Sequence, residues 1–472
     1  MKKIIYILII SFLLIGKGNC MIYYVSPKGL DTNVGTNISA PLKTIQAGID
    51  KAIVDNDEVK LFTGVYNEKI VITQNSIKIS AYELDKPVID GGITLPSSPN
   101  SALITLIGNY NTLSGIEVKN ANLIGKVVGG YGINAVGHHN TLSNLIVHDT
   151  WDSGINVLGD NTVIEDSQIY LTALSSSITH LTWGNGITIG SNSSLDALQL
   201  GITTNTICRR NTLYNNWGEA ILVKESDHTI IEDNIIYDNW TTGLLHIDST
   251  NSTIQRNLIY NSSKSDISKR NNLLPAAIVL TDKTALKTRS QNSVIINNNI
   301  YNANVLLFES SDIWNSGFVN SLFANNTIVL GKLNTGATTN GIVNVNSRIK
   351  NNIIQNSTTL VSSIPTNAGI SFTNNNWLIN PPTTAVASTN VIGDAKLYKY
   401  GLTSAGSMTG AYFRLLVGSG VIGKGVNLTE VTDDYQKTPR DTKTDIGAHE
   451  FLIPTNANPM PICKTICYIP KP

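Results

Sequence analysis

The chain has 472 residues, with 34 Lys and Arg against 34 Asp and Glu, so its formal net charge is zero. A neutral chain creates no long-range field that would favour nucleic acid or an anionic membrane surface. Four cysteines in this length exclude a small fold held by many disulfides, and stability must come from a hydrophobic core.

The N-terminus has the pattern of a secretory signal peptide. Lys2 and Lys3 precede an apolar run that ends at Ile15, and a short polar stretch follows. The run is shorter than the roughly 20 residues needed to span a bilayer. We therefore predict a signal peptide at 1–20, no integral membrane segment, and a secreted or cell-surface protein. Cys20 would carry a lipid anchor if the signal is of the lipoprotein type, although the preceding Asn argues against this.

A short helix is expected next. Residues 41–54 place Ile45, Ile49 and Ala52 at roughly helical spacing, ahead of expected strands at 58–62 and 69–72. A helix in this place would cover the first strand edges of a sheet, which otherwise promote aggregation. We predict that it is an N-terminal cap.

The central part of the chain repeats a motif in which a Tyr follows three residues after an Asn, as in Asn211 with Tyr214 and Asn234 with Tyr237. Most intervals between repeats are 23 to 28 residues, and the two of 44 and 41 residues indicate either two coils or one coil with an inserted loop. The marker position reads Asn144, Ser167, Asn211, Asn234, Asn257, Asn298, Asn326 and Asn352.

Each repeat also contains short β-rich runs with apolar residues at alternate positions. Such strands, joined by Asn, Gly and Asp turns, are typical of a solenoid whose coils stack about 4.8 Å apart. Stacked Asn side chains can bond both their own turn and the next Asn, so the marker row is expected to be structural. By their parity, His246 and Cys208 are expected to lie in the core.

We therefore predict an all-β parallel β-helix domain at 22–451. Its regular coils are expected at about 100–356 and an irregular C-terminal cap at 357–451. The remaining residues, 452–472, form a Pro-rich tail.

Two parts of the chain resemble a known group. Residues 23–29, 41–46 and 64–66 resemble the opening of secreted polysaccharide lyases of families 6 and 9. Residues 445–450, after Arg440, are similar to the closing motif of many bacterial surface β-helix proteins. With the repeats, the chain resembles the pectin-lyase-like superfamily, which implies a right-handed parallel β-helix, export and an extracellular polysaccharide as partner. Lyases, glycosidases, epimerases and proteins without activity share these segments, and the Asp cluster that holds calcium in family 9 is not found in the central coils.

Four tryptophans occupy one phase of the repeat. Each of Trp151, Trp183, Trp217 and Trp240 lies three residues before the small residue that opens a strand. Stacked coils would line them up along one edge, where aromatic faces suit the apolar faces of sugar rings. Packing into a hydrophobic turn is the alternative. We predict that these tryptophans bind substrate.

Ionisable residues cluster near this row. In the strand at 220–224, Ile221 and Val223 should face inward, so Lys224 faces outward toward a ligand. A lyase must neutralise a uronate carboxylate, remove the adjacent proton and protonate the leaving oxygen. The predicted catalytic residues are Lys224, Glu219, Asp152 and His148, and the candidate ligands of a calcium ion are Glu225 and Asp248.

These residues favour a lyase that cleaves an acidic polysaccharide by β-elimination. A glycoside hydrolase with Asp152 and Glu219 as its carboxylate pair is a second class. A non-catalytic glycan-binding or adhesin solenoid is a third. The basic segment 264–292, with Arg289, would wall a groove for an acidic glycan or would be a solvated loop. We expect a monomer that does not bind nucleic acid.

Overall fold

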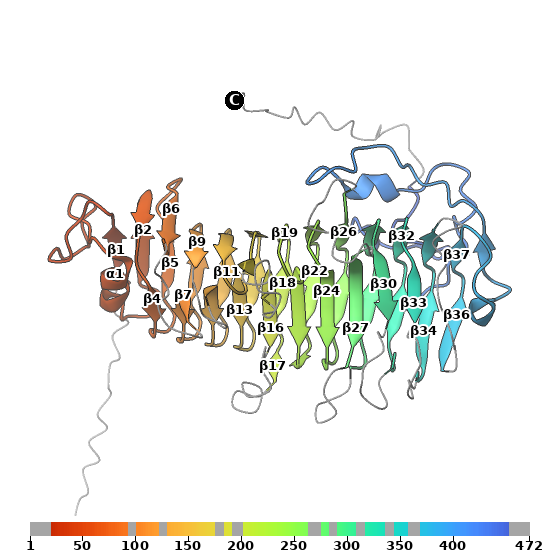
Figure 1. The fold of residues 1–472 in the computed structure, drawn as a ribbon, viewed down its shortest axis with the longest axis horizontal. Coiled ribbons are helices and arrows are strands. Elements are labelled where there is room, and N and C mark those ends of the chain that lie inside the picture. Colours follow the sequence, from red (N-terminus) through yellow and green to blue (C-terminus); the bar gives the residue numbers. More distant parts are fainter. Residues whose placement is uncertain are drawn as a thin grey trace, which may run out of the picture.

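The chain forms an elongated stack of coils, each of which passes through three sheets (Figure 1). Every pairing between named strands is parallel, and the predicted parallel β-helix is confirmed, while its handedness stays a prediction. The computed structural model describes residues 20–92, 101–121, 130–174, 184–190, 202–262, 275–282, 290–307, 317–335, 344–356 and 369–452.

The strands of one coil come from sheets A, B and C in that order. Sheet A consists of β1 (Ile22–Val25), β2 (Glu58–Leu61), β5 (Lys78–Ala81), β8 (Thr112–Ser114), β11 (Thr141–Ser143), β14 (Val163–Glu165), β18 (Ile207–Arg209), β22 (Ile230–Glu232), β25 (Thr253–Gln255), β28 (Val294–Ile296), β31 (Leu322–Ala324), β34 (Ser347–Lys350) and β36 (Ile370–Thr373). Sheet B consists of β3 (Gly64–Tyr66), β6 (Pro87–Asp90), β9 (Glu117–Ala121), β12 (Ile146–Thr150), β15 (Gln168–Tyr170), β19 (Thr212–Tyr214), β23 (Ile235–Tyr237), β26 (Leu258–Tyr260), β29 (Asn299–Tyr301), β32 (Thr327–Val329), β35 (Ile353–Gln355), β37 (Asn376–Trp377) and β38 (Val391–Ile392).

Sheet C, which contains Lys224, lies between sheets B and A in each coil. It consists of β4 (Ile70–Ile72), β7 (Ala102–Leu106), β10 (Tyr131–Ala135), β13 (Ile155–Val157), β16 (Ile187–Gly190), β20 (Ile221–Lys224), β24 (Thr242–Ile247), β27 (Ala276–Thr281), β30 (Asn304–Leu307) and β33 (Leu333–Thr335). The remaining elements are a two-stranded pair, β17 (Thr203–Thr204) with β21 (Ser226–Asp227), helix α1 (Ile45–Lys51), and the 3-10 helices η2 (Thr383–Ala385) and η3 (Gly410–Phe413).

One hydrophobic core runs through the stack, because the inward side chains of all three sheets meet at the centre. In one coil, Ile231, Ile236 and Leu244 come from the three sheets and are at most 1% exposed. Burial of each such side chain stabilises the fold by about 1.5–3 kcal/mol. Cys208 and His246 are fully buried, as predicted, and burial raises the pKa of the Cys208 thiol to about 12. This cysteine is therefore a filler of the core.

The predicted Asn row is confirmed as a structural feature at the turn between sheets A and B. The backbone N–H of Asn211 donates to Oδ1 of Asn234 at 2.9 Å, and that of Asn234 donates to Oδ1 of Asn257 at 3.1 Å. The same bond repeats onward as far as Asn390. Each coil therefore fixes the register of the next.

The first member of the row needs a correction. Leu145 occupies this position, because its N–H donates to Oγ of Ser167 at 3.0 Å, while the predicted Asn144 lies one residue earlier with a left-handed φ of 52°. The two long intervals are single coils with longer connections. Strand β14 pairs directly with β18, and β25 pairs directly with β28.

Replacing Asn257 with alanine is expected to lower the free energy of unfolding by roughly 2–4 kcal/mol, because the change leaves the buried N–H of Asn234 and carbonyl of Ile231 without this partner. Urea denaturation measures the loss. Asn257→Ser is the matched control, since serine occupies the row at Ser167, and it should cost less than alanine. Equal stability of wild type and Asn257→Ala would contradict a stabilising role for this row.

Helix α1 covers the first edges of the solenoid, as predicted. Thr44 caps its N-terminus, where Oγ1 accepts from the N–H of Ala47 at 3.2 Å. The side chain of Gln46 pairs with the edge strand β4, because its Oε1 accepts from the Val71 N–H and its Nε2 donates to the Val71 carbonyl. This arrangement blocks the edge against further pairing. No helix in the described part of the chain is long and apolar enough to cross a membrane.

The paired strands reach beyond the predicted range of 100–356 at both ends. Strands β1 to β6 precede it and β36 to β38 follow it. Residues that follow β37 close the end of the core, where Ala385 joins the main hydrophobic cluster. The later residues of the expected C-terminal cap do something different, because they fold back along the stack.

Residues 394–452, here called the C-terminal segment, lie over the outer face of sheet B (Figure 1, blue). Their buried side chains, among them Met408 and Phe413, pack with Tyr260 and Val329 in a second hydrophobic cluster. The predicted end cap is therefore largely a lateral cover. Sequence patterns did not indicate it, since the segment has no regular repeat.

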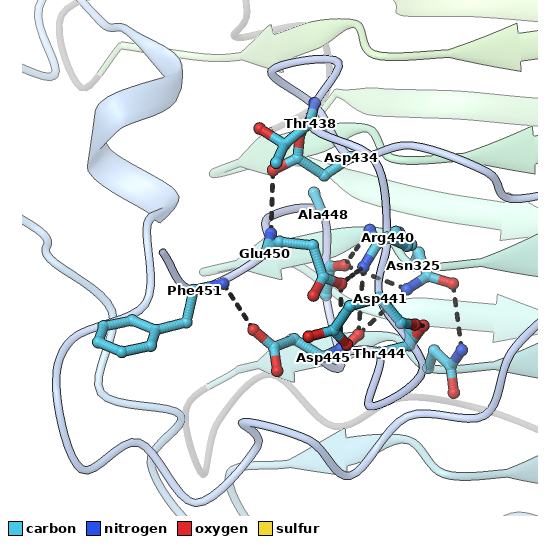
Figure 2. A network of polar contacts seen from close by, with 12 residues as sticks. Asn325, Asp434, Thr438, Arg440, Asp441, Thr444, Asp445, Ala448, Glu450 and Phe451 are labelled. Carbon is cyan, nitrogen blue, oxygen red and sulfur yellow. Dashed lines mark hydrogen bonds and ion pairs between the residues drawn. The ribbon is translucent and has the colours of Figure 1, made fainter. Parts of the chain in front are cut away.

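Polar contacts fasten this cover through the closing motif (Figure 2). The guanidinium of Arg440 pairs with the Glu450 carboxylate and donates to the Gly447 carbonyl at 2.9 Å. Gly447 in turn donates its N–H to the carbonyl of Asn351 in the solenoid at 2.7 Å. Burial raises the pKa of Glu450 and lowers that of Arg440. The motif is thus a buried joint between the C-terminal segment and sheet B.

Two buried histidines are expected to make the fold sensitive to acid. Burial lowers the pKa of His246 to about 4, and burial with Arg414 and Arg440 nearby lowers that of His449 to about 3, from an ordinary 6.5. The unfolded chain therefore binds protons first as pH falls below 6.5, and stability is lost progressively down to about pH 4 and pH 3. Lowering a pKa by one pH unit corresponds to a loss of about 1.4 kcal/mol in acid.

Urea midpoints between pH 7 and pH 4 measure this dependence. His246→Gln, which cannot titrate, is expected to flatten the curve. An equally steep curve in His246→Gln would exclude this histidine as a cause.

Candidate functional site

The structure divides the predicted catalytic residues among three places. His148 lies on β12 in sheet B, Asp152 and Glu219 lie at the corner between sheets B and C, and Lys224 ends strand β20 of sheet C. A strand rises about 3.3 Å per residue, so Glu219 and Lys224 are roughly 16 Å apart along the chain direction. These residues therefore do not form one constellation.

His148 belongs to a row of rings on the outer face of sheet B. Its ring stacks on Tyr170 at 4.7 Å, and its nitrogens contact the carboxylates of Asp149 and Glu117 at 2.7 and 3.3 Å. The row continues through Tyr214, Tyr237 and Tyr260. The structure does not bring His148 together with Lys224, because the two side chains project from different sheets.

At the corner between sheets B and C, Asp152 and Glu219 flank an intervening coil. Asp152 accepts from the N–H of Ser153 at 2.7 Å, and the Ser153 hydroxyl contacts that of Thr188 at 3.1 Å. The Asn185 side-chain amide, oriented with its nitrogen toward Glu219, donates to Oε2 at 2.5 Å. Both carboxylates are mostly buried, at 5% and 7% exposure. They come from coils two steps apart, which corresponds to about 10 Å.

Three members of the predicted tryptophan row, Trp151, Trp217 and Trp240, lie among the described residues. The register of sheet B pairs His148 with Tyr170, Tyr214 and Tyr237 in turn, and three residues further on these coils carry Trp151, Ala173, Trp217 and Trp240. Inserted residues follow Ala173 in the coil of Tyr170, and Trp183 lies outside the described residues. Trp151 and Trp217 are half-buried, whereas Trp240 is 8% exposed and packs edge-on against Trp217 at 5.3 Å. Trp240 thus has little face to offer a sugar.

Trp217→Ala is expected to weaken binding of a recognised glycan by roughly three- to tenfold, because an aromatic contact is worth about 0.5–1.5 kcal/mol. Isothermal titration calorimetry measures the affinity. Tyr214→Ala is the control, since Tyr214 is also half-buried but belongs to the stacked rings of sheet B. Unchanged affinity in Trp217→Ala would assign this tryptophan to packing.

Lys224 is the single Lys or Arg in the ten strands of sheet C, all of which the structure describes. Ile221 and Val223 are fully buried inward, as expected, and the Lys224 side chain is 18% exposed at the outer face. Its Nζ lies 3.9 Å from Oε1 of Glu225. The ammonium therefore stands at the surface beside a carboxylate.

Three carboxylates follow the ends of adjacent sheet C strands. The register pairs Lys224 with Ile247 and Thr281, so the next residues, Glu225, Asp248 and Asp282, occupy one position in successive coils. All three are buried, at 3–4% exposure. The sequence analysis did not predict Asp282. It could have been found because, like Glu225 and Asp248, it directly follows a sheet C strand.

The calcium prediction has no support from this row alone. Among the residues that the structure describes, no group of three or more His, Cys, Asp or Glu side chains is arranged to hold a metal ion. Glu225 and Asp248 as calcium ligands stay a prediction. Arg289, like Trp183, lies outside the described residues.

Comparisons with known proteins agree with the fold. No protein-family model and no curated protein matches the chain. Among solved structures, it is similar to pectate lyase Pel9A, with a TM-score of 0.52 and 18% identity over 92% of this chain and 97% of that one. The likeness shows the parallel β-helix fold.

Two further structures show how varied this group is. The complex of XylC with xylose has a TM-score of 0.59 and 12% identity over 92% of this chain and 98% of that one. A GH136 lacto-N-biosidase from Eubacterium ramulus has a TM-score of 0.51 and 14% identity over 79% and 67%. At these identities the likeness shows the fold alone, and the site must decide the reaction.

Proposed function

We propose that this protein acts on an extracellular polysaccharide at the outer face of sheet C, and that it cleaves a uronate-containing polymer by β-elimination. The observation that carries the proposal is the position of Lys224, the one basic residue of the sheet C strands, at the surface beside Glu225. The likeness to a pectate lyase fold supports it.

In this reaction Nζ of Lys224 acts as the base and removes the proton on the carbon beside the uronate carboxylate. The electron pair forms the new carbon–carbon double bond, and the glycosidic oxygen leaves and takes up a proton. Glu225, 3.9 Å from Nζ, would return the proton that Lys224 has accepted to solvent or to the leaving oxygen. The base and a proton acceptor thus come from consecutive residues of one strand end.

Hydrolysis is the second candidate, and a specific geometry favours it. Asp152 and Glu219 flank Asn185 from coils two steps apart, and roughly 10 Å between backbones is compatible with the carboxylate spacing that glycosidases use. One carboxyl group would protonate the glycosidic oxygen while the other activates water or attacks the sugar. Lys224 would have no part in this reaction.

The test is incubation of the purified chain with pectate, alginate, glycosaminoglycans and neutral glycans, with calcium or with a chelator. Unsaturated-uronate absorbance and reducing ends are followed together. A rise in both on one acidic polymer is the expected result. Reducing ends without absorbance would replace elimination by hydrolysis at Asp152 and Glu219, and binding without either signal would leave a glycan-binding solenoid.

A further inference from the structure

One backbone position repeats along the corner where sheet C passes into sheet A. Strand register places one residue of each coil there, and all of these residues have φ between 46° and 81°. We call them the left-handed column. Its members are Asn56, Ser76, Tyr110, His139, Asn161, Asn205, His228, Asn251, Asn292, Asn320, Asn346 and Gly369.

Tyr110 departs from the local rule of this column. The left-handed conformation crowds the Cβ atom, and Asn and Gly adopt it at least cost, which explains why they fill most of the positions. A bulky tyrosine gains nothing from this backbone. A residue kept against local preference points to a role outside the backbone, as strained positions often do.

Tyr110 and His139 form an exposed, ordered pair of rings. Their centroids are 4.4 Å apart with an interplanar angle of 8°, and Tyr110 is 59% exposed. Backbone bonds hold both residues, from Tyr110 N–H to the His138 carbonyl at 2.9 Å and from His139 N–H to the Asp160 carbonyl at 2.8 Å. The coil on the other side of Tyr110 carries the short Ser76, so one face of the phenol ring is left open to a ligand.

Polar groups lie on the other side of the ring pair, in the two coils that follow Tyr110. Asn109 accepts from the His138 N–H at 2.7 Å, and Nδ1 of His138 accepts from the Asp160 N–H at 3.0 Å. Because Nδ1 accepts, the neutral imidazole carries its hydrogen on Nε2, where it can donate to a ligand hydroxyl. The side chains of His138 and Asp160 are 51% and 32% exposed. A donor and an acceptor therefore lie beyond the ring pair, on the side away from the open face of Tyr110.

We infer that Tyr110 and His139 form a subsite for a pyranose ring of the polysaccharide. The C–H face of one sugar would stack on Tyr110, and hydroxyl groups of a neighbouring sugar would meet His138 and Asp160, one and two coils further on. This inference rests on the proposed function. Sheet C takes four steps from β7, which precedes Tyr110, to β20, which ends at Lys224, or about 19 Å. A polymer that reaches Lys224 along this edge would cross the subsite.

Affinity electrophoresis of the full chain in gels that contain polygalacturonate, alginate or xylan tests the subsite. Tyr110→Asn is expected to raise the dissociation constant by roughly three- to tenfold on the polymer that retards the wild type. Tyr110→Phe keeps the face and should bind as the wild type does. His228→Asn is the matched control, because it makes the same kind of change in the same column without a stacked tyrosine.

Asn suits this backbone, so Tyr110→Asn should melt at the wild-type temperature or above, and lost binding cannot then come from unfolding. Equal retardation of wild type, Tyr110→Asn and His228→Asn would overturn the subsite while leaving the proposed function intact. A wild type that none of these polymers or those of the cleavage panel retards would contradict the proposed function itself, and the subsite with it. A change in sedimentation of Tyr110→Asn would assign the rings to a protein contact and also overturn the inference.

Discussion

Replacing Lys224 with alanine is expected to lower the rate of elimination by about 10²- to 10⁴-fold, the usual contribution of a positioned general base. No other Lys or Arg lies in the sheet C strands, so none of their side chains can substitute for it. Because the Lys224 side chain lies beside the buried Glu225, the melting temperature of the variant is measured together with its rate. Unsaturated-uronate absorbance under saturating substrate measures the rate.

Lys350→Ala is the matched control for this experiment. Lys350 also ends a strand, β34, but that strand belongs to sheet A. Its replacement should leave the rate at the wild-type value. Full activity in Lys224→Ala would remove Lys224 from the mechanism, and an equal loss in both variants would point to a general effect on the fold.

The fold was largely predictable because the repeated side chains of one coil contact the equivalent side chains of the next coil. Asn211, Asn234 and Asn257 stand at equal spacing since each accepts from the backbone of the coil before it. The same logic placed His246 and Cys208 inward. The prediction failed at Asn144, because an apolar residue, Leu145, holds the row position in that coil. The hydrogen bond from the Leu145 N–H to Ser167 identifies this position.

The candidate site was less predictable, because residues of one coil lie on three sheets. Linear proximity grouped His148 with Asp152, yet the turn between them carries these side chains to different faces of the solenoid. The alternation of inward and outward side chains within one strand was predicted correctly, since Ile221 and Val223 are buried and Lys224 faces outward.

Replacing Arg440 with methionine is expected to lower the free energy of unfolding by about 3–5 kcal/mol, because it leaves the Glu450 carboxylate buried without its cation. The two side chains are 3% and 7% exposed. Loss of the guanidinium also removes its bond to the Gly447 carbonyl within the segment and its bond to Asn297 of the solenoid. Urea denaturation followed by tyrosine fluorescence measures the change, since the C-terminal segment covers Tyr237 and Tyr260.

A second arginine tests whether the loss of stability in Arg440→Met comes from the burial of the ion pair or from the loss of any ion pair. Arg210 also pairs with carboxylates, Glu165 and Asp166, but its side chain is 41% exposed, so Arg210→Met should cost no more than about 1 kcal/mol. In Arg440→Met, the further change Glu450→Gln should restore part of the stability, because it removes the uncompensated buried charge. If Arg440→Met cost as little as Arg210→Met, the closing motif would not hold the C-terminal segment, and the apolar contacts around Phe413 would have to hold it alone.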